Sequence, residues 1–440
     1  MSPSTRGWLA GILLPAAAAL AGLSGSYLLP LEHEAIQYTR LAPGDAVARL
    51  QQQMNSGAVK LTYEDEFGYL RSALKALDVP LTSQVLVFSK TSFQAPRISP
   101  RTPRALYFND TVQVGFVRTG DVLEFAALDP KQGVMFYTLD QERTGQPHFE
   151  RRDTCLQCHQ AGSTLGVPGL LVRSVFPDQS GMPRFEAGTF ITDHRSPLKE
   201  RWGGWYVTGT TGGQVHMGNA TVSEANAPQQ LPAADAQNVT DLRPFLDPGA
   251  YLTPHSDVVA LMTLEHQTQM VNLLTRVGWE TRLALYDNEG MNKAFDRPAG
   301  AVSESVTHRI DNAVEELLSY LLFREETPLT EAVGGTSGFA EQFAKAGPRD
   351  GKGRSLRDFD LRTRMFRHPC SYMLYSDAFD SLPPAAKDRL YRRLYEVLTG
   401  QDRTAQYANF PLEQRQAILE ILRETKKDLP VYWRSANKSS

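Results

Sequence analysis

The chain has 440 residues, of which 41% are hydrophobic and 22% are charged, close to the composition of ordinary soluble proteins. This balance excludes a polytopic membrane protein and a disordered chain, and the length predicts two or three packed units. The 46 basic and 49 acidic residues leave a formal net charge of -3, so no excess of positive charge is present to bind nucleic acid or anionic lipid.

The N-terminal 31 residues are predicted to direct export. Arg6 is followed by an uncharged, largely apolar stretch from Gly7 to Leu31, and the next charged residue is Glu32. A basic residue before an apolar run is typical of a secretory signal, and this run is also long enough to span a bilayer. A cleaved signal and a retained inner-membrane anchor both stay open. Either one places the rest of the chain in the periplasm or elsewhere outside the cytoplasm.

The first part of the chain after this segment changes from a helical to a strand-like pattern. Residues 45–77 are predicted to form two short helices, because apolar residues recur at intervals of three and four. From Ser83 onward, short runs of branched and aromatic residues alternate with turn residues, which is typical of antiparallel strands. These runs lie at 85–88, 105–108, 112–117, 122–127 and 134–139, and again at 170–176, 185–191 and 202–207.

The second half is predicted to be mainly helical. Thr253 and Pro254 predict the cap and first turn of a helix that reaches Val277. Further helices are expected at 303–324, 384–398 and 412–425, whereas the glycine-rich stretch 334–353 is expected to be largely loop. The fold class is therefore α+β. The predicted organisation is a signal or anchor at 1–31, a β-rich domain at 32–222, an irregular, proline-containing linker at 223–250 and a helical domain at 251–440.

Two of the three cysteines stand at positions 155 and 158, and His159 follows directly. Two thiols separated by two residues can each add to one vinyl group of a haem, and the adjacent imidazole then reaches the iron. A zinc site needs a second pair of ligands at short spacing, and a thioredoxin-like pair needs a long helix after it, which Gly162 and Gly166 oppose. The sequence therefore predicts one covalently attached haem c on Cys155 and Cys158, with His159 as an iron ligand.

A second iron ligand would decide between electron transfer and chemistry on a small molecule. Met217 is the favoured candidate, because its surroundings are rich in glycine and aromatic residues that suit close approach to a macrocycle. His216, His194, Met182 and an open site are the alternatives. His266 is a weaker candidate, since it shares a helical face with two methionines, which is more typical of a core.

The pentapeptide Cys155-Leu156-Gln157-Cys158-His159 resembles the haem-attachment motif of c-type cytochromes. The longer pattern from Pro103–Phe108 to Arg201–Tyr206 resembles large exported bacterial proteins described as cytochrome c domain-containing, a group without an established substrate. The resemblance implies covalent haem c with His159 as the proximal iron ligand. We therefore expect an exported mono-haem cytochrome that transfers electrons to or from a periplasmic or membrane redox partner. A haem enzyme acting on peroxide, oxygen or another small molecule is the alternative.

Cys370 has no partner within the chain if the other two cysteines bind haem. Unpaired cysteine is among the most buried residue types, so a buried free thiol is expected at this position. An intermolecular disulfide and a reactive thiol are the alternatives.

Overall fold

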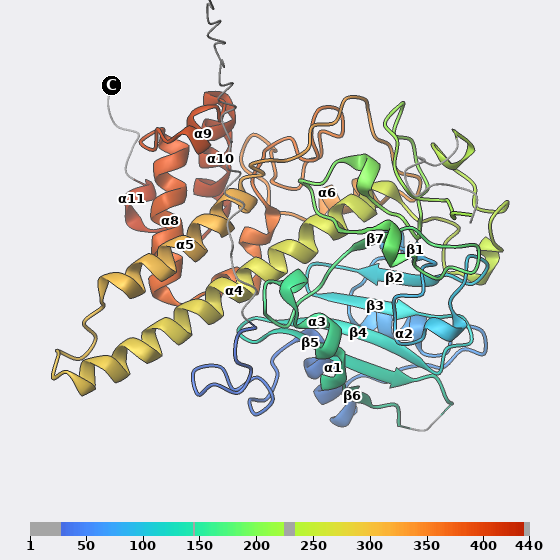
Figure 1. The fold of residues 1–440 in the computed structure, drawn as a ribbon, viewed down its shortest axis with the longest axis horizontal. Helices are drawn as coiled ribbons and strands as arrows, with labels where there is room; N and C mark the ends of the chain where they lie inside the picture. The colour runs from blue at the N-terminus through green and yellow to red at the C-terminus, as the bar shows by residue number, and fades with distance from the viewer. Residues whose placement is uncertain (1–27, 144–145, 224–233, 435–440) are drawn as a thin grey trace, which may run out of the picture.

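The computed structural model describes residues 28–143, 146–223 and 234–434 (Figure 1). Its N-terminal half is built on an antiparallel sheet and its C-terminal half is mainly helical, so the predicted α+β class is confirmed. Most of the predicted export segment, residues 1–27, lies outside the described residues. Within the three described ranges, no helix combines the length and the apolar character needed to cross a membrane.

The main sheet has seven strands in the order β6-β5-β4-β3-β2-β1-β9, and neighbouring strands are antiparallel throughout. The five strands predicted between residues 85 and 139 are confirmed. Asn109 and Asp129 close the turns of two hairpins, because each side chain accepts hydrogen bonds from backbone N–H groups two and three residues ahead. The strands are β1 (Val85–Val87), β2 (Arg104–Phe108), β3 (Val112–Phe116), β4 (Val122–Asp129), β5 (Gly133–Asp140), β6 (Phe149–Arg151) and β9 (Trp205–Tyr206).

The strands predicted after residue 169 are shorter than expected. β7 (Arg173–Val175) and β8 (Thr189–Ile191) pair only with each other, and β9 adds to the edge of the main sheet beside β1. Gly188 precedes β8 with a φ of +113° and Gly204 precedes β9 with a φ of +85°. Backbone with positive φ breaks an extended run, which explains why β8 and β9 are only three and two residues long.

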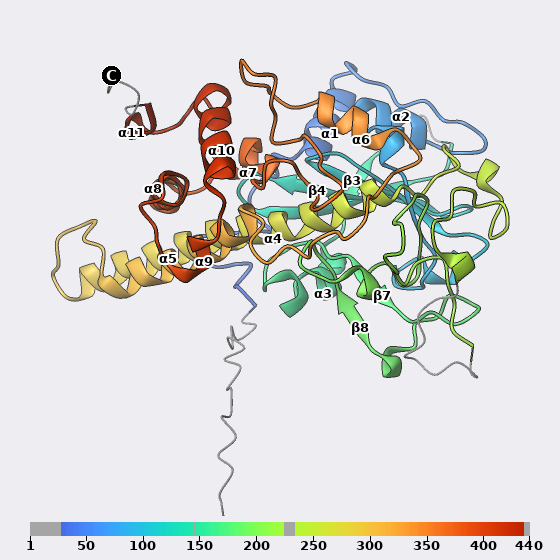
Figure 2. The ribbon, with the colours of Figure 1, turned by 90° about the horizontal axis from the view of Figure 1, so that it is seen from above.

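Alternate side chains of the strands point to opposite faces of the sheet, and each face is covered by different elements. Figure 2 shows α1 (Ala46–Asn55) and α2 (Leu70–Ala76) on one side, and α3 (Leu156–His159) with the β7–β8 hairpin on the other. Asp45 caps α1 and accepts a hydrogen bond of 2.6 Å from the Tyr137 hydroxyl of β5. This bond fixes α1 on the sheet.

α4 (Val258–Ala294) is a helix of 37 residues that connects the two halves. It passes along the strand ends, where the Gln267 side-chain amide donates a hydrogen bond of 2.6 Å to the Asn109 carbonyl in the β2–β3 turn. Further along, Thr275 packs against Gly133 at the start of β5. Most of its residues in the first six turns are buried, so this helix belongs to the core on more than one face.

The predicted ends of this helix are wrong. The cap is Asp257, not Thr253, because the Asp257 carboxylate accepts hydrogen bonds from the first-turn N–H groups while Thr253 and Pro254 lie in the preceding turn. The helix also continues past Val277, because its later turns pack against α5 (Glu304–Leu321), which runs alongside α4 beyond the sheet (Figure 1).

One apolar core extends from β1, β2, β4 and β5 through α4 and α5 to the C-terminal helices. The helices predicted at 303–324, 384–398 and 412–425 are confirmed as α5, α8 and α10. The stretch 334–353, predicted as largely loop, also holds the short helix α6. The remaining helices are α6 (Phe339–Lys345), α7 (Asp377–Asp380), α8 (Pro384–Thr399), α9 (Ala405–Ala408), α10 (Leu412–Thr425) and α11 (Val431–Arg434).

Candidate haem-attachment site

The cysteine–histidine motif lies on one face of the main sheet, directly after β6. The Arg152 N–H donates a hydrogen bond to the Phe136 carbonyl of β5, and the chain then forms a 3₁₀ turn and the single helical turn α3. Leu165 and Gly166 both have positive φ values, of 57° and 76°. They turn the chain back toward β5, where Pro168 accepts a hydrogen bond from the Val134 N–H.

Both motif thiols are free and accessible enough for a covalent reaction. Cys155 is partly buried and Cys158 is exposed. Residues three apart in a helical turn lie on the same side of it, so the two sulfur atoms can serve one flat group. Burial raises the pKa of Cys155, so this thiol is protonated at neutral pH.

His159 is held in one orientation by two contacts. Its Nδ1 lies 3.0 Å from the Gly169 carbonyl oxygen, and its ring packs against Phe136 at 4.8 Å between centroids. A carbonyl can only accept, so Nδ1 carries the proton and Nε2 carries the lone pair. Within the described residues Nε2 makes no hydrogen bond. A hydrogen bond from one ring nitrogen to a backbone carbonyl is the usual support of a histidine that binds metal through the other.

The loop that supplies this carbonyl is tied to α4. Asn272 accepts a hydrogen bond of 2.9 Å from the Leu170 N–H and donates one of 2.8 Å to the Leu170 carbonyl. A Cβ atom at Gly169 would lie 2.2 Å from the Asn272 Oδ1. Only glycine therefore fits between His159 and α4.

The sheet surface beside His159 carries apolar and charged groups. Gln113, Ala126 and Phe136 form one cross-strand row, and Gly115, Glu124 and Thr138 form the next. Arg104 covers Gly115 and forms an ion pair with Glu124. The small Ala126 and the Phe136 ring, bordered by this ion pair, suit a flat group with an apolar body and acidic edge, so the residues present fit a haem.

Met217, the predicted sixth ligand, lies against β7. It is 7% exposed, and its sulfur accepts a hydrogen bond of 3.6 Å from the Ser174 hydroxyl. Its methyl group faces Gly203. Ser174 and the preceding Arg173 point to opposite sides of the strand, and it is Arg173 whose charge acts on His159. Ligation of iron by Met217 stays a prediction.

Two other ligand candidates and the third cysteine lie in different settings. His216 is buried, burial lowers its pKa to about 4, and its Nδ1 accepts a hydrogen bond of 3.0 Å from the Gly218 N–H. Met182 is 51% exposed, at the end of a turn closed by Asp178. Cys370 is fully buried with a raised pKa, as expected for a free core thiol.

His194 and His266 form a buried pair between the two halves of the chain. Their Nδ1 atoms are 2.8 Å apart, so one of them donates a hydrogen bond to the other. Nε2 of His266 lies 2.8 Å from the Ser371 hydroxyl, and both rings stack on Tyr320. Both nitrogens of His266 are therefore engaged, which supports the prediction that it belongs to the core.

This pair is expected to make the protein less stable below about pH 6.5. Burial lowers the pKa of His194 and of His266 well below the usual value, so the folded pair stays neutral while the unfolded chain takes up protons. Each histidine that is protonated only in the unfolded chain lowers the free energy of unfolding by about 1.4 kcal/mol for each pH unit below about 6.5. The slope is measured by urea unfolding at a series of pH values from about 7.5 to about 5.

The variant H194Q is expected to have a shallower slope than the wild type. Burial raises the pKa of Glu265 to about 7, so this carboxyl gains a proton on folding in the same range and opposes the histidines. Glu265 contributes equally to both proteins, so its contribution cancels when the slope of H194Q is subtracted from that of the wild type. H308Q, which replaces an exposed histidine, is the matched control. Equal slopes for H194Q and wild type would show that the buried pair does not govern the acid response.

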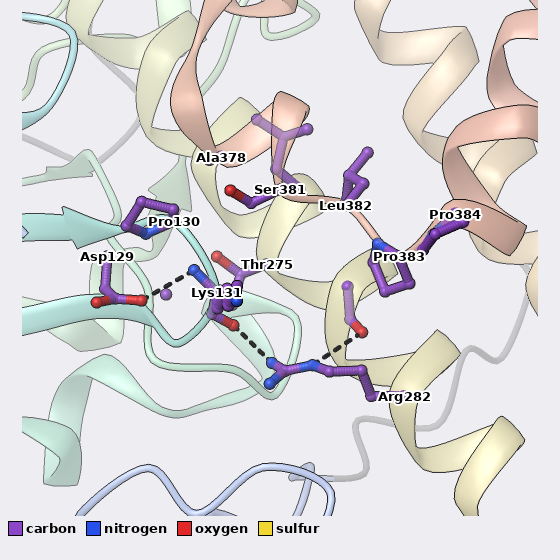
Figure 3. A pocket seen from close by; sticks show the side chains of 13 residues that line it. Asp129, Pro130, Lys131, Thr275, Arg282, Ala378, Ser381, Leu382, Pro383 and Pro384 are labelled. Atoms are coloured by element: carbon purple, nitrogen blue, oxygen red, sulfur yellow. Dashed lines mark hydrogen bonds between the residues drawn. The ribbon is translucent and has the colours of Figure 1, made fainter. Parts of the chain in front are cut away.

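A separate pocket of about 350 Å³ lies between the β4–β5 turn, α4 and the start of α8 (Figure 3). Its polar groups already bond to one another. Arg282 donates hydrogen bonds to the Lys131 and Gly278 carbonyls, and the Lys131 N–H donates to Asp129. Burial lowers the pKa of Arg282 to about 10. The pocket is thus a polar junction between sheet and helices, away from the cysteine–histidine motif.

The sequence located the two thiols and the imidazole, but it did not identify their supports. Phe136 and Asn272 carried no signal, because their roles come from contacts between distant segments. Among the described residues, no group of three or more Cys, His, Asp or Glu side chains could hold a metal ion. Comparison with protein-family models, curated proteins and solved structures finds no match to this chain.

Proposed function

We propose that this protein is an exported cytochrome that carries one haem c on Cys155 and Cys158 and transfers electrons outside the cytoplasm. The observation that carries the proposal is the orientation of His159. Its Nδ1 donates to the Gly169 carbonyl, and Nε2 is left with its lone pair and without a partner among the described residues. This nitrogen is open to solvent and carries the lone pair that a haem ligand requires.

The chain's own residues would supply binding and orientation, and the haem iron would supply the redox chemistry. The two thiols would anchor the macrocycle, and His159 would bind the iron. The small Ala126 side chain and the Phe136 ring would lie against the macrocycle, bordered by Arg104. Because attachment requires export and dedicated maturation, the predicted periplasmic location and redox partner belong to the same proposal.

A second candidate function is a haem enzyme that acts on peroxide, oxygen or another small molecule. Two donor atoms on the same sheet face, Arg104 Nε and Gln113 Nε2, are buried without a hydrogen-bond partner in the described residues. Donors of this kind next to a haem decide whether a bound small molecule is held or activated. An iron with an open sixth position beside them would favour the enzyme.

Two measurements on one sample test these functions. Protein produced with the cytochrome maturation machinery is expected to keep the mass of one haem after denaturation and extraction with acidic organic solvent. If the mass equals that of the bare chain, the proposal is wrong. With haem present, the reduced spectrum under carbon monoxide separates the two functions: an unchanged spectrum indicates a filled sixth position and electron transfer, and rapid binding indicates an open site.

A further inference from the structure

Arg173, the first residue of β7, is a half-buried cation without an acidic partner. In the described residues its guanidinium forms no ion pair or hydrogen bond, and it lies over the Phe185 ring, 5.9 Å from Cζ to centroid. The other arginines near the motif are paired. Arg104 pairs with Glu124, Arg151 with Asp153 and Arg152 with Glu150. A partly desolvated guanidinium without a counter-charge is unfavourable unless an anion joins it.

The position of Arg173 places this charge opposite the histidine. Figures 1 and 2 agree that α3 and the β7–β8 hairpin lie on the same side of the main sheet. The Trp205 indole N–H donates a hydrogen bond of 2.8 Å to the Arg173 carbonyl, which fixes β7 above the β1–β9 edge, whereas α3 follows β6 at the other edge. Ala126 of β4, and Arg104, which covers Gly115 of β3, lie on the sheet between them.

One apolar core joins the two sides. Trp205, which bonds to the Arg173 carbonyl, and Phe136, which packs against the His159 ring, both belong to it. Arg173 and His159 are therefore both attached to this face of the sheet. A flat group bound through His159 would extend over β3 and β4 toward Arg173.

We propose that Arg173 binds a carboxylate of the haem, one of its two propionates. This inference rests on the proposed function and assigns a residue to the acidic edge of the cofactor. A guanidinium matches a carboxylate with two parallel N–H···O bonds, a geometry that the point charge of lysine does not reproduce. Phe185 would shield the pair from water, because its ring already lies beside the guanidinium.

The variant R173Q tests the assignment through the reduction potential and the resonance Raman bands of the propionates. A fixed positive charge near the iron disfavours the oxidised form, so its removal is expected to lower the midpoint potential. The propionate bending bands are expected to shift because the hydrogen bonds are lost. R173K keeps the charge without the paired geometry, so its potential is expected to lie between those of R173Q and the wild type.

R151Q is the matched control. The Arg151 guanidinium donates to the Tyr38 carbonyl and pairs with Asp153, so its loss is expected to leave the propionate bands unchanged. The proposal is overturned if the bands of R173Q equal those of the wild type, or if R151Q shifts them equally. The mass of bound haem distinguishes failure of the Arg173 assignment from failure of the proposed function. Haem-loaded R173Q with wild-type bands overturns only the role of Arg173, whereas wild-type protein without haem mass overturns the proposed function.

Discussion

Replacing both Cys155 and Cys158 by serine is expected to abolish covalent haem attachment, so that acidic organic solvent removes all haem from the denatured protein. Serine cannot form the thioether bonds, although it preserves the size and polarity of the side chains. Because Cys158 is exposed and Cys155 only partly buried, the fold is expected to survive. Intact-protein mass spectrometry of wild type and variant, matured under the same conditions, measures the loss.

Single variants and a third cysteine make this result specific. C155S and C158S each leave one thiol, so each is expected to retain a smaller, single-bonded fraction of haem. C370A removes the buried thiol of the C-terminal half and is expected to retain the full haem mass. Equal haem retention in the double serine variant and the wild type would contradict attachment through this motif.

Replacing Asn272 by leucine is expected to lower the free energy of unfolding and to disturb the iron ligand. Leucine has a similar volume but can neither donate to the Leu170 carbonyl nor accept from its N–H. An unpaired buried polar group costs about 1–3 kcal/mol, so the two groups together predict a loss of about 2–6 kcal/mol. The loop that positions the Gly169 carbonyl against His159 is then released, and the proximal ligand loses its fixed orientation.

Asn288 provides a control on the same helix. Its side chain donates to the Ala301 carbonyl and accepts from the Ser303 N–H, so N288L leaves the Ser303 N–H unpaired, while Asn292 still donates to the Ala301 carbonyl. It lies where α4 meets α5, beyond the sheet. N288L is expected to lose about 1–3 kcal/mol in urea unfolding, for one unpaired group, while the haem absorbance and reduction potential stay as in the wild type. If N272L leaves the spectrum as unchanged as N288L does, Asn272 has only a structural role.

The sequence alone predicted the elements whose patterns are local. The five strands between residues 85 and 139 and the helices at 303–324, 384–398 and 412–425 were predictable, because alternating and helical periodicities persist over each element. The first and last residues of α4 were not predictable from the sequence. Its cap depends on Asp257, and its final turns are helical because α5 packs beside them, which is a contact between segments.

The candidate site divides in the same way. The thiols and the imidazole were identified from their spacing, since the reaction with one porphyrin constrains neighbouring residues of the chain. The residues that orient His159 come from elsewhere in the sequence: Phe136 from β5 and Asn272 from α4, with Arg173 of β7 added in our proposal. No periodicity relates these residues to the motif. Only the packing of the sheet against α4 and the hairpin brings them together, because hydrogen bonds and ion pairs are satisfied by proximity in space and leave no regular trace along the chain.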